Sequence, residues 1–219
     1  RDRSVSRGLG DVYKRQIEGR ADVEKLTLLP VVGDIPLADE KAGSIAVFEN
    51  KNNLMSETFR NVRTNLQFML EKGRNVILVT STISGEGKSF VSANLAISLS
   101  LLGKKVVIVG LDIRKPGLNK VFNIPKKEHG ITQFLTNPIT NLMDLVQSSD
   151  INKNLFILPG GTVPPNPTEL LARDGLEKAI ETLKQNFDYV ILDTAPVGMV
   201  TDTLLIGRIV DLSVYVCRA

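Results

Sequence analysis

The stretch VILVTSTISGEGKSF, residues 76–90, joins a wholly apolar run to a glycine-bearing loop. Val76 to Val79 contains no polar residue, which is typical of a parallel strand buried on both faces of a sheet. The loop at 82–89 follows, and Lys88 to Leu102 predicts a helix that ends before Gly103. This order of strand, loop and helix is the context in which a phosphate-binding P-loop is expected.

The residue types of this loop suit a nucleoside triphosphate and its magnesium ion. Glycines let backbone N–H groups turn toward phosphate oxygens, and the N-terminus of the helix adds the positive end of its dipole. Lys88 could reach the terminal phosphates, and Ser89 could hold Mg²⁺ through its hydroxyl. We expect ATP to bind at Ser84, Gly85, Glu86, Gly87, Lys88, Ser89 and Phe90. Thr82 replaces the first glycine of the general motif, and the plainer alternative is a turn with a solvated lysine.

Two aspartates stand where strands of the same sheet are expected to end. Asp193 directly follows the run 189–192, and Asp112 follows the run 106–109 after a two-residue step. Ligands of parallel α/β sheets bind at the carboxyl ends of the strands, where a P-loop also needs acidic groups for its metal ion. The candidate magnesium ligands are therefore Ser89, Asp112 and Asp193. The candidate catalytic residues are Lys88, Asp112 and Asp193. Either aspartate could instead be an ordinary helix cap or turn former.

Strands alternate with helices along most of the chain. Apolar residues recur at helical spacing from Met55 to Met69. Further helices are predicted at 88–102 and 169–185, and buried strands at 76–79, 106–109, 155–158, 189–192 and 210–217. This alternation predicts an α/β fold of the three-layer P-loop type, with helices on both faces of a mostly parallel sheet.

Charge and cysteine content narrow the class of protein. The formal net charge is +3, but residues 1–20 hold six Lys or Arg against three Asp or Glu, which leaves 21 of each for residues 21–219. A neutral body without a basic stripe argues against a nucleic-acid partner. The single cysteine, Cys217, has no partner for an internal disulfide and fits a reducing compartment. We interpret Cys217 and His129 as structural.

The N-terminal part differs in composition from the rest. Residues 1–20 mix charge, glycine and serine without periodicity, which predicts a non-native or disordered tail. Prolines and a glycine interrupt short apolar runs at 23–37, so we expect an extended linker over 21–53. The catalytic domain is then expected at 54–219. No apolar run approaches the roughly 20 residues that a membrane-spanning helix needs.

Several motifs, in this order, resemble those of the bacterial tyrosine kinases of polysaccharide export, the BY-kinases, from about Val23 onward. SGEGKS is similar to the family's form of Walker A. VIVGLDIR at 107–114 looks like its second acidic motif, and ILDTAP at 191–196 like its Walker B. The family's Glu-x-x-Arg-x-x-Arg helix matches ETFRNVR at 57–63, and PNPTELL at 165–171 resembles a segment that leads into a helix.

The resemblance implies a protein-tyrosine kinase that uses ATP and Mg²⁺. Lys88 and Ser89 would bind the nucleotide, Asp112 and Asp193 the metal ion, and the phosphoryl group would pass to a tyrosine hydroxyl through a loose transition state. The second acidic motif of the family has two aspartates two residues apart, and the first helps to deprotonate the acceptor. Gly110 occupies that first position here. Asp112 could then serve alone, or activity could be low.

Partners and location also follow from the resemblance. Glu57, Arg60 and Arg63 would assemble subunits into a ring, although these charges could form only a solvated helix face. The acceptor would be a tyrosine-rich tail of a neighbouring subunit. The three tyrosines of this chain form no such cluster, so we expect a C-terminal truncation. The domain would act in the cytoplasm at the inner face of the membrane, with a transmembrane activator domain or subunit, in polysaccharide chain-length control and export.

Two other functions are compatible with these motifs. A partitioning or positioning ATPase of the same deviant P-loop superfamily would hydrolyse ATP to switch dimerisation, but such proteins carry a signature lysine where this chain has Ile83. A nucleotide-binding scaffold without chemistry would be consistent with Gly110. Arg114 and Lys115, close behind Asp112, could be surface charges or could contact phosphate or the acceptor.

Overall fold

The computed structural model describes residues 17–38, 43–49, 53–125, 129–137 and 139–219. Its centre is a six-stranded sheet in the order β3-β4-β2-β5-β1-β6. The strands are β1 (Val76–Ser81), β2 (Val106–Gly110), β3 (Gln147–Ser148), β4 (Leu155–Leu158), β5 (Tyr189–Asp193) and β6 (Leu212–Val216). Neighbouring strands pair in parallel except for the edge pair β3 and β4.

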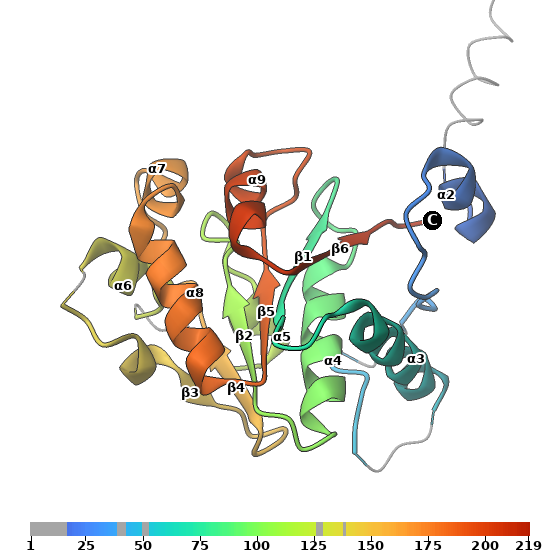
Figure 1. Ribbon diagram of the computed structural model, residues 1–219, viewed down its shortest axis with the longest axis horizontal. Helices are drawn as coiled ribbons and strands as arrows, with labels where there is room; N and C mark the ends of the chain where they lie inside the picture. Colours follow the sequence, from blue (N-terminus) through green and yellow to red (C-terminus); the bar gives the residue numbers. More distant parts are fainter. Residues whose placement is uncertain (1–16, 39–42, 50–52, 126–128, 138) are drawn as a thin grey trace, which may run out of the picture.

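Helices cover both faces of this sheet, so the predicted three-layer α/β fold is confirmed (Figure 1). One face carries α3 (Leu54–Met69), α4 (Lys88–Ser100) and α5 (Leu118–Val121). The other carries α6 (Ile131–Thr136), α7 (Pro167–Leu171), α8 (Asp174–Asn186) and α9 (Asp202–Ile206). The 3-10 helices η2 (Leu142–Leu145) and η3 (Gly207–Ile209) and the N-terminal helix α2 (Arg20–Leu26) complete the elements.

Alternate strand residues serve two separate hydrophobic cores. In β2, Val107 and Val109 face the core under α8, whereas Val106 and Ile108 face the core under α3 and α4. The same alternation continues in β1 and β5. Because both faces of these strands are buried, the runs 76–79, 106–109 and 190–192 are wholly apolar and carry no period-two pattern.

The predicted helix at 169–185 is wrong as a single element. The chain forms α7 and α8 instead, separated by Ala172 and by Arg173, whose backbone is extended. Both helices contact α6, but α7 also packs against α9, whereas α8 also packs against β5.

Within 21–53, where an extended linker is expected, the structure has a helix and a segment that lies on the domain. Residues 1–16 of the expected tail lie outside the described residues, but Arg20 begins helix α2, where it forms an ion pair with Glu24 one turn later. The chain after α2 is extended and lies on the domain, where Asn65 Nδ2 donates to Val32 O at 2.9 Å. This segment is therefore packed on the fold for part of its length.

Asn94, a fully buried residue of α4, forms hydrogen bonds with the backbone of residues 44–47, near the end of this segment. Its Oδ1 accepts from Ala46 N at 2.8 Å and from Val47 N at 3.0 Å. Its Nδ2 donates to Ser44 O and to Phe90 O. One side chain thus satisfies buried backbone groups that lie almost fifty residues away in sequence.

We predict that Asn94→Ala lowers the free energy of unfolding by about 2–4 kcal/mol, because it leaves buried amides without acceptors. Ser100→Ala is the matched control, since Ser100 is equally buried but its hydroxyl donates only to Ile97 O within the same helix. Urea unfolding of both variants measures the difference. Equal losses would contradict the anchoring role of Asn94.

Candidate nucleotide-binding site

The P-loop connects the C-terminal end of β1 to the N-terminus of α4. Gly85 and Gly87 have φ angles of 94° and 93°, a backbone conformation that strains residues with a Cβ. No side chain caps the N-terminus of α4 at Gly87. The first amides of a 13-residue helix are therefore left for a ligand, and amides in this position bind phosphate.

Side chains on both sides brace the start of this loop. Ile83 N donates to Glu86 Oε2 at 2.8 Å, and Ser81 Oγ donates to Ile83 O at 2.8 Å. Thr82, which replaces the usual glycine, places its hydroxyl 2.6 Å from Tyr215 Oη of β6. The threonine is thus accommodated by a neighbouring strand, and Glu86 contributes to the shape of the loop.

Lys88 and Asp112 face each other at the centre of the site. Lys88 Nζ lies 3.2 Å from Asp112 Oδ2, and the two side chains are only 12% and 10% exposed. Lys115 N donates to Asp112 Oδ1 at 3.0 Å, which closes a turn after the acid. The P-loop lysine therefore points at the end of β2, where the sequence predicted an acidic ligand.

Asp193 ends β5 and is 1% exposed. Ser89 Oγ donates to its Oδ2 at 2.8 Å, and Ser92 Oγ donates to its Oδ1 at 3.2 Å. Burial raises the pKa of Asp193 to about 6, although Lys88 and the two serines favour the charged form. Its backbone carbonyl accepts from the amides of Leu111 and Asp112. The two acidic strand ends are thus joined directly.

These groups suit a magnesium ion bound together with a nucleotide. Among the described residues no cluster of three or more His, Cys, Asp or Glu side chains could hold a metal ion alone. Mg²⁺ commonly takes one or two carboxylates and completes its shell with water and substrate phosphates. Two carboxylates and the Ser89 hydroxyl beside a P-loop match that preference.

Other predicted residues have different surroundings. Ser84 is exposed on the loop. The ring of Phe90 packs toward α3, with its centroid 6.0 Å from that of Phe59, so only its backbone amide could meet a phosphate. Arg114 is exposed at the surface over 37% of its side chain, and its guanidinium binds the carboxylate of Asp202 rather than the P-loop. Lys115 reaches the site through its backbone.

Gly110, which replaces an acid of the family motif, ends β2 in close contact with another loop. A Cβ built there would lie 3.0 Å from Gly160 N and 3.4 Å from Leu118 Cδ1. An aspartate at this position would therefore require the chain near Gly160 to shift. The packing is adapted to glycine.

The sequence interpretation missed Ser92, Asp202 and Thr168. Ser92 lies three residues after Ser89 on the same face of α4, a spacing that could have drawn attention to it. Asp202 and Thr168 meet Arg114 only through the tertiary fold. Thr168 lies within the PNPTELL segment, but no local pattern indicates that it or Asp202 contacts Arg114.

The fold and the site together define a P-loop nucleotide-binding domain. A family model described as an AAA domain matches residues 74–208. Tyrosine-protein kinase CpsD of Streptococcus agalactiae is 37% identical over 163 residues, which cover 74% of this chain and 70% of that protein. The crystal structure of the chimerical protein CapA2B2 is similar with a TM-score of 0.80 and 35% identity, over 89% of this chain and 83% of the other.

The kinase domain of Escherichia coli tyrosine kinase ETK is similar with a TM-score of 0.83 and 28% identity, over 92% of this chain and 82% of that chain. The chain belongs to the bacterial tyrosine kinases, the BY-kinases. It spans 25% of a putative tyrosine-protein kinase from the cps region of Klebsiella pneumoniae, at 34% identity over 82% of this chain. MinD of Pyrococcus horikoshii, complexed with Mg-ADP, has a TM-score of 0.56 at 24% identity, over 65% of this chain and 57% of the other, which shows a shared fold.

We predict that Asp193→Asn stabilises the protein without nucleotide by about 1–3 kcal/mol at pH 8, because it removes the cost of burying a charge. The same variant should lose the additional stability that Mg²⁺ gives in the presence of ADP. Thermal unfolding with ADP, with and without Mg²⁺, measures both effects. Unchanged stabilisation by Mg²⁺ would contradict the role of Asp193 as a ligand.

Proposed function

We propose that this chain binds Mg-ATP at the P-loop and transfers the terminal phosphate to protein tyrosine. The observation that carries the proposal is the convergence of Lys88, Ser89, Asp112 and Asp193 at the carboxyl ends of β1, β2 and β5. Relatives named tyrosine-protein kinases support the choice of acceptor.

Each residue of the site has a distinct task in this mechanism. The amides of the P-loop and the Lys88 ammonium bind the phosphates, and Ser89, Asp112 and Asp193 hold the magnesium ion. The ion, when bound, neutralises charge on the transferring group. Ser92 keeps the Asp193 carboxylate oriented, since its hydroxyl donates to Oδ1. Such a transfer depends on position and electrostatics, so it requires little covalent chemistry from the protein.

Asp112 is the acid best placed to accept the proton of the tyrosine hydroxyl. Gly110 offers no side chain, and Asp193 is buried below Ser89 and Ser92. Asp112 would then serve both the metal ion and the acceptor. A slow phosphoryl transfer is the expected consequence.

We predict that incubation with Mg-ATP and a tyrosine-rich peptide yields phosphotyrosine, and that Lys88→Met lowers the rate at least about 100-fold because a phosphate contact is lost. Lys120→Met, which removes an exposed lysine of α5, is the control. Anti-phosphotyrosine blotting and phosphate release are measured together. Free phosphate alone would favour a switch ATPase, and neither product would favour a scaffold.

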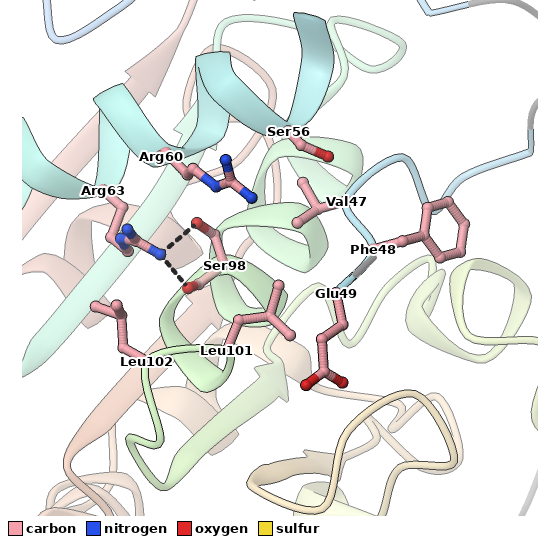
Figure 2. A pocket seen from close by; sticks show the side chains of 9 residues that line it. All are labelled: Val47, Phe48, Glu49, Ser56, Arg60, Arg63, Ser98, Leu101 and Leu102. Atoms are coloured by element: carbon pink, nitrogen blue, oxygen red, sulfur yellow. Dashed lines mark hydrogen bonds between the residues drawn. The ribbon is translucent and has the colours of Figure 1, made fainter. Parts of the chain in front are cut away.

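The proposal for self-association involves Glu57, Arg60 and Arg63 of α3. Glu57 and Arg60 form an ion pair along the helix. Arg63 Nη1 donates to Ser98 O at 2.7 Å and to Ser98 Oγ at 3.3 Å, so this arginine docks α3 onto α4 (Figure 2). We infer that Glu57 and Arg60 meet a second subunit, whereas Arg63 fixes the helix that presents them.

We predict that Arg60→Ala abolishes ring assembly, and that Arg63→Ala lowers the unfolding temperature as well because it removes contacts with α4. Arg74→Ala is the control, since Arg74 forms a similarly spaced, exposed ion pair with Glu71. Light scattering after size exclusion and thermal unfolding are the measurements. Assembly that survives Arg60→Ala would refute this interface.

The remaining parts of the proposal concern the whole system. Residues 54–219 would be the kinase domain, the acceptor would be a tyrosine-rich tail of a neighbouring subunit, and a transmembrane activator would place the domain at the inner face of the membrane. Polysaccharide chain-length control and export would be the process it regulates. No helix in the described part of the chain is long and apolar enough to cross a bilayer.

A further inference from the structure

An ion pair joins the loop after β2 to α9 beside the nucleotide site, and although its acid is buried, the Arg114 side chain is 37% exposed. Asp202, the first residue of α9, is 1% exposed. Its Oδ2 accepts from Arg114 Nε at 2.7 Å, and its Oδ1 accepts from Arg114 Nη2 at 3.1 Å. Such a two-pronged contact fixes both the distance and the plane of the guanidinium.

Thr168 of α7 completes the group. Its hydroxyl accepts from Arg114 Nη2 at 2.7 Å and donates to Asp202 Oδ1 at 2.8 Å. Although burial favours the neutral acid, the hydrogen bonds from Arg114 and Thr168 lower the pKa of Asp202. The pair is therefore charged, and the loop after β2 is attached to both α7 and α9.

The same loop carries Asp112, two residues before Arg114. Upstream, the amides of Leu111 and Asp112 donate to Asp193 O at 2.8 and 3.0 Å. Downstream, the Arg114 side chain is the contact that reaches from the loop to α9. Asp112 is thus held between two attachment points, and one of them is Asp202.

The downstream attachment becomes more important when a nucleotide binds. Lys88 contacts Asp112 directly, but the phosphates would compete for its ammonium group. The carboxylate must then keep its position through its own backbone and through the hydrogen bond that Lys115 N donates to its Oδ1. Residues outside the ligand shell that hold a metal ligand in this way commonly change metal affinity 10- to 100-fold.

We propose that Asp202 is a positioning residue for magnesium: through Arg114 it fixes the loop that presents Asp112 to the metal ion of the nucleotide. The inference rests on the proposed function, in which Asp112 is a magnesium ligand. A purely structural ion pair would change stability and leave the dependence on Mg²⁺ unaltered. A positioning pair must change that dependence.

The experiment measures ADP affinity by calorimetry over a range of free Mg²⁺ concentrations, and once in EDTA. For Asp202→Asn we expect the Mg²⁺ concentration at half effect to rise about tenfold or more, with ADP affinity in EDTA unchanged. Arg114→Lys, which keeps the charge but not the fork, should give a smaller shift in the same direction. Arg74→Ala, far from the site, should match the wild type.

A charge-balanced variant separates position from electrostatics. Asp202→Asn leaves the Arg114 charge unpaired, and that charge could repel Mg²⁺ without any movement of the loop. Asp202→Asn/Arg114→Gln removes both charges. Its Mg²⁺ concentration at half effect should be raised by as much as in the single variant, since both changes disrupt the same ion pair. Recovery of the wild-type Mg²⁺ dependence in the double variant would overturn the proposal.

Two further outcomes keep the result interpretable. An unaltered Mg²⁺ dependence in Asp202→Asn would overturn the inference even if the unfolding temperature fell. If that variant does not fold, Arg114→Lys and Thr168→Val carry the same test. Asp112→Asn tests the underlying function separately, because a normal Mg²⁺ response in that variant would refute the metal role of Asp112 itself.

Discussion

The buried carboxylate of Asp193 is the constraint on which the rest of the site depends. Its side chain holds Ser89 and Ser92 of α4, and its carbonyl holds the amides of Leu111 and Asp112. Desolvation disfavours the charged form of Asp193, and its pKa is accordingly raised to about 6. Binding of a magnesium ion to this carboxylate would offset the cost of its desolvation.

The strand order explains how Asp193 can contact both the P-loop helix and the loop after β2. β5 lies between β2 and β1, so its carboxyl end adjoins both the loop of Asp112 and the P-loop. Gly110 pairs with Asp193 in register, and Val79 does so on the other side. The candidate ligands therefore come from three neighbouring strand ends. The register of β5 against β2 and β1 sets which residues stand at that edge.

Features that are contiguous in the chain could be predicted from the sequence, whereas contacts between distant segments could not. The P-loop, Asp112 and Asp193 were identifiable because strand, loop and acid are contiguous in the chain. The break between α7 and α8 and the bonds of Asn94 to the segment before α3 were not, since they depend on which elements meet in space. Arg114 shows the limit most clearly. The sequence left open whether Arg114 is a surface charge or contacts phosphate or the acceptor, whereas the fold pairs it with Asp202.

Gly110, at the end of β2, also bears on the position of Asp112. An acid at the end of β2 would add a second proton acceptor, but the backbone of Gly160 lies too near to admit one without movement. Gly160 in turn approaches Gly110 O and the ring of Pro116, so the loops after β2 and β4 are packed on each other. In the proposed mechanism, with that acid absent, Asp112 would accept the tyrosine proton, and its position would matter more. Asp193 O upstream, Lys115 N at the carboxylate itself and the Arg114–Asp202 pair downstream are contacts that set this position.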